Sequence, residues 1–300
     1  MKRASLVHNP SAGDGNHAKE KLLKSIKKAG YKVDYISTED EFWESFIVNE
    51  YIPDFIFIAG GDGTIRKVAK LLLQKGIYMD IPIFLFPLGT ANNIAKTLKI
   101  DTEKHREIPQ DVLKPQNFNF GKINGFQNNN FFIESVGAGI FPELIYSMKN
   151  QSLEDEKPAD KLKRTLKTLH KIVKEFKAQR ATLNIDGIAI QGSFLLIELM
   201  NIQSIGPNLN IAPSAKIDDG YFDLVLIRDV DRELFSNNLD DLIDAKLNLN
   251  ALKNFTQTIS AQKVSLKWNG DKMHVDDNLI TRYNGDLITL EMHPKSFRIY

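Results

Sequence analysis

The 300-residue chain contains no cysteine, which excludes a disulfide framework, a thiolate metal site and a cysteine nucleophile. The same absence fits a cytoplasmic protein. No apolar run approaches the ~18 residues of a membrane-spanning helix, and the apolar stretch near the N-terminus is too short for a signal peptide. An excess of one charge is also lacking. The 39 basic and 38 acidic side chains give a net charge of +1, so we expect no nucleic-acid partner.

A glycine-rich run, Gly60–Thr64 (GGDGT), is the most informative feature that is present. It follows the apolar strand pattern Phe55–Ala59 and precedes the helical pattern Ile65–Gln74. Glycine lets the backbone approach a ligand closely, and the N–H groups at a helix start bind anions. The run therefore predicts a nucleotide phosphate site, where Asp62 holds a cation or water. The alternative is a tight strand-to-helix turn with Asp62 as N-cap.

The first 100 residues alternate between strand and helix patterns, which predicts an α/β unit with a parallel sheet covered on both faces. We expect a helix over about 18–28 and another over about 39–48. Loops with glycine fall after three of the predicted strands, at Gly13, Gly60–Gly63 and Gly89. Ligands in such sheets bind at the carboxyl ends of strands, so these loops should converge.

From about residue 118 the pattern changes to many short strands and turns, which predicts an antiparallel β-sandwich. Two helical stretches interrupt it, about 159–178 and about 232–242. We place the first domain at 1–118, joined by the C-terminal segment 295–300, and the second at 119–294. The isolated histidines, His8, His170, His274 and His293, lack paired ligand spacing, so we expect structural roles for them, and core positions for Trp43 and Trp268.

Several motifs occur in a fixed order along nearly the whole chain. They are Asn9–Gly13 (NPSAG), Gly60–Thr64, Pro87–Ala95 (PLGTANNIA), Asn201–Pro207, Ala212–Asp223 and His293–Arg298. In these motifs the chain resembles the diacylglycerol kinase catalytic domain family, which includes soluble bacterial lipid kinases, sphingosine kinases and ceramide kinases and is related to NAD kinases. The resemblance implies an N-terminal nucleotide domain, a C-terminal β-sandwich and an active site between them.

The resemblance also implies transfer of the ATP γ-phosphate to the hydroxyl of diacylglycerol or a similar lipid. Asp62 would organise Mg²⁺ and the phosphates as a catalytic residue, and this chemistry asks mainly for positioning and charge neutralisation. The residues that would bind ATP are Asn9, Pro10, Ser11, Ala12, Gly13, Thr38, Gly60, Gly61, Asp62, Gly63, Thr64, Gly89, Thr90 and Asn92.

A second magnesium ion is implied at the turn Asp218–Tyr221, where soluble bacterial members of the family hold a structural Mg²⁺. Its ligands would be the Asp219 carboxylate and the backbone carbonyls of Lys216 and Tyr221. Hard oxygen donors suit Mg²⁺. The alternative is an ordinary hairpin turn before the strand 222–227.

The chain departs from the family where acids are expected. The family's general base lies in a late Asp-Gly-Glu run, and the best-aligned stretch here is Val275–Asn278, in which Asn278 replaces the glutamate. Either Asp276 or Asp277 takes the role of the base, or activity is weak or absent. The stretch 269–271 (Asn-Gly-Asp) is a second candidate, which we interpret mainly as a turn. Amides also replace expected acids at Asn119 and in the pair Asn92–Asn93.

The segment 157–180 carries nine basic and two acidic side chains, with apolar residues at helical spacing. Its basic face either is solvated or meets anionic lipid headgroups. The second interpretation predicts a lipid substrate at the membrane surface and a peripheral contact with the inner face of the membrane. The sequence is compatible with a homodimer and does not fix the oligomeric state.

Three functions therefore remain open at this point. The leading one is an ATP- and Mg²⁺-dependent lipid kinase. An NAD kinase shares the GGDGT run and the two-domain organisation, although the motifs Pro87–Ala95 and Ala212–Phe222 favour the lipid enzyme. The third is a catalytically weak or silent relative that binds nucleotide or lipid, as Asn278 and Asn119 suggest.

Overall fold

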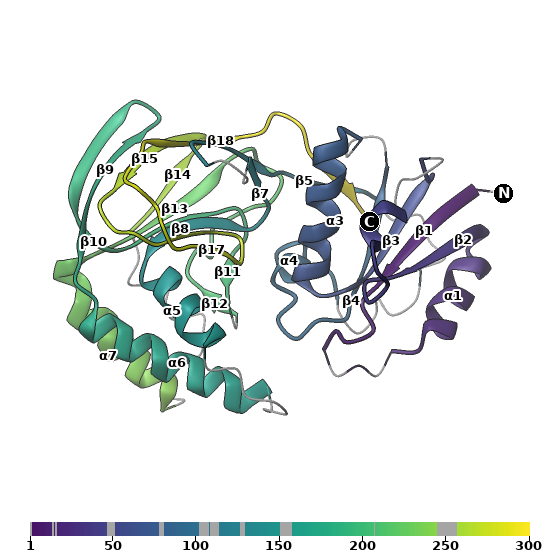
Figure 1. The fold of residues 1–300 in the computed structure, drawn as a ribbon, viewed down its shortest axis with the longest axis horizontal. Coiled ribbons are helices and arrows are strands. Elements are labelled where there is room, and N and C mark those ends of the chain that lie inside the picture. The colour runs from purple at the N-terminus through teal and green to yellow at the C-terminus, as the bar shows by residue number, and fades with distance from the viewer. Residues whose placement is uncertain are drawn as a thin grey trace. The chain divides into compact units, whose positions relative to one another are not determined.

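A computed structural model describes residues 2–13, 15, 17–46, 52–77, 81–101, 108, 114–126, 130–150, 158–206, 208–244 and 257–300. The chain divides into two compact units (Figure 1). The first comprises Met1–Asn119 with Pro294–Tyr300, and the second comprises Phe120–His293. Lys157 and Pro207, which belong to two of the sequence patterns above, lie outside the described residues.

The first unit is built on a six-stranded sheet in the order β2-β1-β3-β4-β19-β5. All strands are parallel except the edge strand β5. All five residues of β4 are buried, as expected for a sheet that is covered on both faces. The strands are β1 (Lys2–His8), β2 (Tyr31–Ser37), β3 (Phe55–Gly60), β4 (Ile83–Pro87), β5 (Gln116–Phe118) and β19 (Phe297–Ile299).

Helices cover this sheet because the connections β1–β2 and β3–β4 run in opposite directions along it, and right-handed crossovers then lie on opposite faces. On one face, Leu22 and Ile26 of α1 pack against alternate residues of the strands, such as Leu6 and Phe57. Figure 1 shows α1 and α3 on either side of the strands. The helices are α1 (Lys19–Lys28), α2 (Trp43–Phe46), α3 (Asp62–Lys75) and α4 (Asn93–Thr97).

The helix expected over 39–48 is wrong in extent, because α2 begins only at Trp43. Phe42 has a φ of 59°, a left-handed conformation that interrupts a right-handed helix. Residues 47 and 48 lie outside the described part of the chain.

The second unit contains an eleven-stranded antiparallel sheet, which confirms the predicted antiparallel β class. The long strand β10 joins its halves, because it pairs with β8, β9 and β13. The core between the faces includes Phe194, Leu266 and Trp268. The strands are β6 (Gly121–Asn124), β7 (Phe131–Phe132), β8 (Ser135–Gly139), β9 (Gln179–Ile185), β10 (Ile188–Met200), β13 (Phe222–Arg228), β14 (Gln257–Ala261), β15 (Lys263–Trp268), β16 (Met273–Val275), β17 (Asn278–Ile280) and β18 (Ile288–Met292), with β11 (Ser204–Ile205) and β12 (Leu209–Asn210) as a separate pair.

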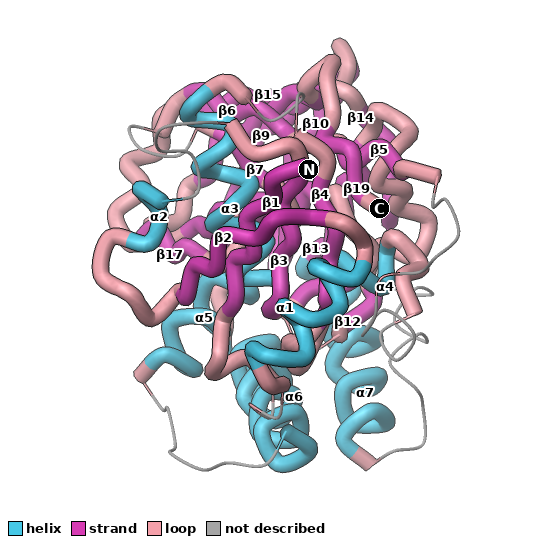
Figure 2. The backbone as a smooth tube through the Cα atoms, turned by 90° about the vertical axis from the view of Figure 1, so that its right-hand side faces the viewer, coloured by secondary structure: helices cyan, strands magenta, loops and turns pink. Residues whose placement is uncertain are grey.

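Helices α6 (Pro158–Glu175) and α7 (Arg232–Ile243) match the two expected stretches, and they pack side by side (Figure 2). A third helix, α5 (Ile140–Lys149), was not predicted. It follows β8 directly at Gly139, and Pro142 sits in its first turn, where proline is tolerated. None of the helices in the described part of the chain has an apolar stretch long enough to cross a bilayer.

Candidate nucleotide and acceptor sites

The glycine loops of the first unit meet at the carboxyl ends of β1, β3 and β4. A Cβ on Gly13 would lie 2.3 Å from the Leu88 carbonyl oxygen, and a Cβ on Gly89 would lie 2.5 Å from the Cα of Gly61. Both contacts are far shorter than van der Waals distance, so only glycine permits these approaches. The structure therefore brings together the loops that the sequence analysis expected to converge.

Hydrogen bonds also join these loops to the strands beside them. The Asn9 side-chain amide donates to Thr64 Oγ1 at 3.4 Å, and the Leu88 N–H donates to the Gly60 carbonyl at 2.9 Å. The Thr38 N–H donates to the His8 carbonyl at 2.8 Å, which places Thr38 beside the first loop. Within that loop, Ser11 donates to Asn9 Oδ1 through both its N–H and its hydroxyl, Ala12 is buried, and Pro10 and Gly13 form part of the same turn.

Asp62 links the second and third loops. Its Oδ2 accepts the Asn93 N–H at 2.9 Å, and its Oδ1 accepts the Ile94 N–H at 3.0 Å. Asp62 is itself the first residue of α3, whose N-cap is Gly61, so the interpretation of Asp62 as the N-cap of its own helix is wrong. The carboxylate instead binds the start of α4, and its negative charge lies at the meeting point of the loops.

Asn92 and Thr90 differ in their surroundings within the third loop. Asn92 is 8% exposed in a left-handed conformation, and its Oδ1 accepts the Gly89 N–H at 2.9 Å. Its amide donates to the carbonyls of Pro87 and Gly89, so Asn92 shapes the loop. Thr90 is exposed and available to a ligand. Lys96 lies one helical turn after Asn92. Burial lowers the pKa of Lys96, and the nearby Asp62 charge raises it by less, so the net pKa is lowered. Lys96 was not predicted as a site residue, although Asn92 was.

Hydrogen bonds connect Tyr35, His8 and His17 in series to the main chain of the first loop. This series was not predicted from the sequence. The His17 Nε2 lies 2.9 Å from the Ala12 carbonyl, His17 Nδ1 lies 2.8 Å from His8 Nε2, and His8 Nδ1 lies 2.9 Å from the Tyr35 hydroxyl. A carbonyl only accepts, so His17 Nε2 donates to Ala12. The donor and acceptor in the other two bonds depend on the tautomers of the rings. Burial, with His17 and Lys19 nearby, lowers the pKa of His8 to about 4.

The turn between β16 and β17 is anchored through Asp276. Its Oδ1 accepts the N–H groups of Ile133 and Glu134 at 2.9 Å and of Ser135 at 3.4 Å. Asp276 is 5% exposed and has a φ of 52°, so its carboxylate holds the turn together. The neighbouring Asp277 and Asn278 are exposed. Residues 269–271 form a bend before β16, as expected, and Asn119 lies between β5 and β6.

Beneath this turn lies a fully buried pair, Glu198 of β10 and His274 of β16, with Nε2 and Oε1 2.9 Å apart. The His274 Nδ1–H donates to the Asp276 carbonyl at 2.6 Å. Burial lowers the pKa of His274, while the Glu198 carboxylate raises it, and the net pKa is raised. A Cβ on Gly137 would lie 1.7 Å from Glu198 Oε2, which explains the glycine there. The structural role that we expected for His274 is thus one of positioning.

The turn that was expected to bind a structural Mg²⁺ is exposed at Lys216, Asp219 and Tyr221. The Asp219 Oδ1 accepts the Tyr221 N–H at 3.0 Å. Burial raises the pKa of the nearby Asp223, the Ser214 hydroxyl bond opposes this, and the Asp219 charge adds to it. One carboxylate and two carbonyls suit an ion that keeps several waters, as Mg²⁺ does. Among the described residues, no three His, Asp or Glu side chains gather as metal ligands.

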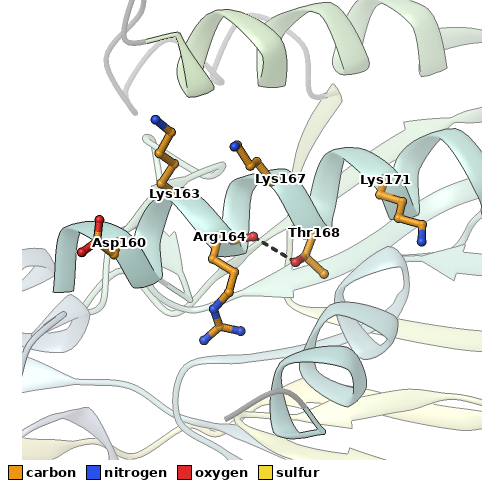
Figure 3. A pocket seen from close by; sticks show the side chains of 6 residues that line it. All are labelled: Asp160, Lys163, Arg164, Lys167, Thr168 and Lys171. Atoms are coloured by element: carbon orange, nitrogen blue, oxygen red, sulfur yellow. Dashed lines mark hydrogen bonds between the residues drawn. The ribbon is translucent and has the colours of Figure 1, made fainter. Parts of the chain in front are cut away.

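Basic side chains of helix α6 line an open pocket along this helix (Figure 3). Lys163, Lys167 and Lys171 are spaced four residues apart and are exposed. The opposite face of the helix, with Leu169 and Val173, is buried. The residues that line the pocket are Asp160, Lys163, Arg164, Lys167, Thr168 and Lys171.

The other flank of α6 is fixed by α7. The Arg232 guanidinium donates to the carbonyls of Val173 and Phe176 at the end of α6. His170 lies 2.9 Å from the Ser236 hydroxyl and 3.2 Å from the Asp240 carboxylate, so this histidine serves helix packing.

The chain combines an α/β unit with converging glycine loops and a large antiparallel β unit. Comparison with protein families identifies both parts. The model described as "Diacylglycerol kinase catalytic domain" matches residues 3–119. The model described as "YegS C-terminal NAD kinase beta sandwich-like domain" matches residues 147–295. The chain belongs to the diacylglycerol kinase catalytic domain family, which is a family of kinases.

Individual relatives agree with this assignment. The chain is 27% identical over 241 residues to a diacylglycerol kinase of Bacillus subtilis (strain 168). The aligned region covers 76% of this chain and 74% of the relative. It is 28% identical over 242 residues to a diacylglycerol kinase of Staphylococcus aureus (strain bovine RF122 / ET3-1). That alignment covers 75% of this chain and 70% of the relative. A crystal structure of a diacylglycerol kinase from Bacillus anthracis str. Sterne has the same fold, with a TM-score of 0.71 at 19% identity over 99% of this chain and 96% of that one.

Proposed function

We propose that this protein transfers the γ-phosphate of ATP to the hydroxyl of diacylglycerol or a similar lipid in the presence of Mg²⁺. The observation that carries the proposal is the convergence of the three glycine loops around Asp62 at the N-terminus of α3. The names of the relatives point to the same acceptor.

The residues of the first unit suit the binding of a polyphosphate. The first N–H groups of α3, directly after Gly61, have no partner within the helix and suit anionic oxygens, and the dipole of α3 adds to this attraction. Asp62 is held in place by two N–H bonds, so its carboxylate would hold Mg²⁺ without further ordering. A Mg²⁺ ion held there would supply neutralisation of the charge that develops on the phosphoryl group. The protein's contribution is positioning, which is the main requirement of phosphoryl transfer.

The test is incubation of the purified protein with γ-labelled ATP, Mg²⁺ and mixed micelles of diacylglycerol, sphingosine or ceramide, with NAD as a separate acceptor. Label in a lipid supports the proposal. Label in NAD alone would identify the NAD kinase alternative. ATP binding without transfer to any acceptor would identify a silent relative. Two observations favour that outcome: the Asp276 carboxylate is engaged by backbone N–H groups, and residue 278 is an amide. The homodimer stays a prediction that analytical ultracentrifugation checks.

We further propose that α6 binds anionic membranes, since the acceptor lipid resides there. Lysines at i, i+4 and i+8 repel one another along a helix, and an anionic surface relieves that repulsion. The row of Lys163, Lys167 and Lys171, continued by Lys174, lies on the exposed side of α6. The buried opposite face keeps the helix on the β unit, so the membrane contact is a surface contact through charge.

Vesicle sedimentation tests this surface. Reversing the charge of Lys163, Lys167, Lys171 and Lys174 to glutamate should weaken binding to phosphatidylglycerol-rich vesicles by about a thousandfold, given about 1 kcal/mol for each of the four basic residues. The matched control reverses four exposed lysines of α1: Lys21, Lys24, Lys27 and Lys28. Equal loss in both variants would mean that only net charge matters. Unchanged binding in the α6 variant would contradict the proposal.

A further inference from the structure

Three side chains connect the sheet of the first unit to the first loop, Asn9–Gly13. The Tyr35 hydroxyl lies 2.9 Å from His8 Nδ1, and His8 Nε2 lies 2.8 Å from His17 Nδ1. The series ends where His17 Nε2 donates to the Ala12 carbonyl at 2.9 Å. It therefore joins two strands to one of the loops that the proposed function assigns to the nucleotide.

The sheet holds one end of this series in place. Tyr35 belongs to β2 and His8 is the last residue of β1, and the two strands pair in parallel. His8 is 2% exposed, and its carbonyl accepts the Thr38 N–H at 2.8 Å. The Lys19 ammonium lies 3.8 Å from the centre of the Tyr35 ring, so the start of α1 contacts the series as well. His17 thus bonds to a side chain that cannot move freely.

The other end of the series holds a tight turn. The Ala12 carbonyl also accepts the Gly15 N–H at 3.0 Å, which closes the turn over residues 12–15. Gly13 has a φ of 61° and Gly15 a φ of 68°, both in the left-handed region that favours glycine. Glycines leave a loop many conformations, and each further bond to the main chain selects among them. His17 supplies such a bond.

The His17 bond also sets the direction of one peptide group. A peptide bond is planar and trans, so the Ala12 carbonyl and the Gly13 N–H point in opposite directions. Because His17 holds the carbonyl, the Gly13 N–H points away from the series. Gly13 is exposed, and among the described residues none accepts a hydrogen bond from its N–H. Backbone N–H groups in turns of this kind bind anionic oxygens.

We infer that His17, held by His8 and Tyr35, is a positioning residue for the nucleotide, because it fixes the peptide whose N–H meets the phosphates. The inference rests on the ATP binding that the proposed function assigns to the first loop. Without the His17 bond the loop samples other conformations, and the affinity for ATP falls with the population of the competent one. A single neutral hydrogen bond is strong enough to change that population by about threefold to tenfold.

Two substitutions at His17 separate its two contacts. The amide of glutamine reaches about as far as Nε2, and the amide of asparagine about as far as Nδ1. His17→Gln therefore keeps a donor for the Ala12 carbonyl, whereas His17→Asn keeps only the contact with His8. In calorimetry with MgATP and the full chain, the Kd of His17→Gln should stay within about twofold of the wild type and that of His17→Asn should rise by about threefold to tenfold. The matched control is His170→Asn, which alters a histidine of helix packing and should leave the Kd unchanged.

Melting temperatures and kinetics separate positioning from packing. Since His17 is partly exposed, both variants should fold, and each loses one contact, so both should melt below the wild type. A role in stability alone would give both the same ATP affinity. In the lipid assay, His17→Asn should raise the KM for ATP and leave kcat unchanged, as a loss of uniform binding does.

The outcomes for the inference and for the proposed function are distinct. Equal Kd values for the two His17 variants, or a lower kcat with an unchanged KM in His17→Asn, would overturn the inference alone. The expected Kd values without transfer to any lipid would support the inference and overturn the proposed function. A wild-type protein that does not bind ATP would overturn both.

Discussion

Replacing Asp62 with asparagine tests the geometry of the nucleotide loops before any catalysis is measured. The two N–H groups that the Asp62 carboxylate accepts belong to Asn93 and Ile94, which are 3% and 0% exposed. Asparagine keeps one acceptor oxygen, so one of these buried donors faces an NH₂ group and loses its partner. A buried donor left unsatisfied costs about 1–3 kcal/mol, and the free energy of unfolding should fall by that amount.

The assay is urea unfolding of the wild-type protein and Asp62→Asn, with the melting temperature as a second readout. The control is Asp54→Asn, which alters an exposed carboxylate that accepts the single N–H of Arg3 at 2.8 Å. A surface substitution of this kind changes stability by less than about 0.5 kcal/mol. If Asp62→Asn proved as stable as Asp54→Asn, the assignment of Asp62 as the anchor of α4 would be refuted.

Two further predictions concern protons and metal. The folded-state pKa of His8, about 4, lies below its unfolded value of 6.5, so the unfolded state takes up a proton first as the pH falls. Stability should therefore be complete above pH ~6.5 and decline toward pH ~4, by at most about 1.4 kcal/mol per pH unit, and His8→Gln should flatten this decline in a pH series of thermal melts. If Asp219 helps to hold Mg²⁺, then millimolar MgCl₂ should raise the melting temperature of the wild-type protein and not that of Asp219→Asn. An equal rise in both proteins would remove Asp219 from the metal site.

Features encoded in contiguous stretches could be predicted from the sequence. The alternation of apolar runs and glycine loops predicted the α/β unit, and parallel strands place their carboxyl ends along one edge. That rule brought Gly13, Gly61 and Gly89 to one place, which the short approaches between their loops bear out. The strand over residues 263–268 was predicted because apolar and polar residues alternate along it. Trp268, within that strand, is buried as expected.

Contacts between distant segments could not be derived from local patterns. The binding of Asp62 to the start of α4 joins residues 31 and 32 positions apart, and the contact between Glu134 and Asp276 spans 142 positions. A signal for one such contact did exist. Glu198 is a single acid within the apolar run FLLIELM, and an acid in a buried strand requires a buried partner, which His274 provides. The helix α5 was missed because its apolar start continues the pattern of β8 without a break.

The proposed function is phosphorylation of a lipid hydroxyl at a site organised by Asp62. The most direct test is steady-state transfer from γ-labelled ATP to diacylglycerol in anionic mixed micelles, with the wild-type protein and Asp62→Ala side by side. We predict labelled phosphatidic acid that accumulates linearly with the wild-type protein and falls by at least about a hundredfold with Asp62→Ala. Equal transfer by both proteins, or ATP binding by the wild-type protein without transfer to any lipid, would contradict the account.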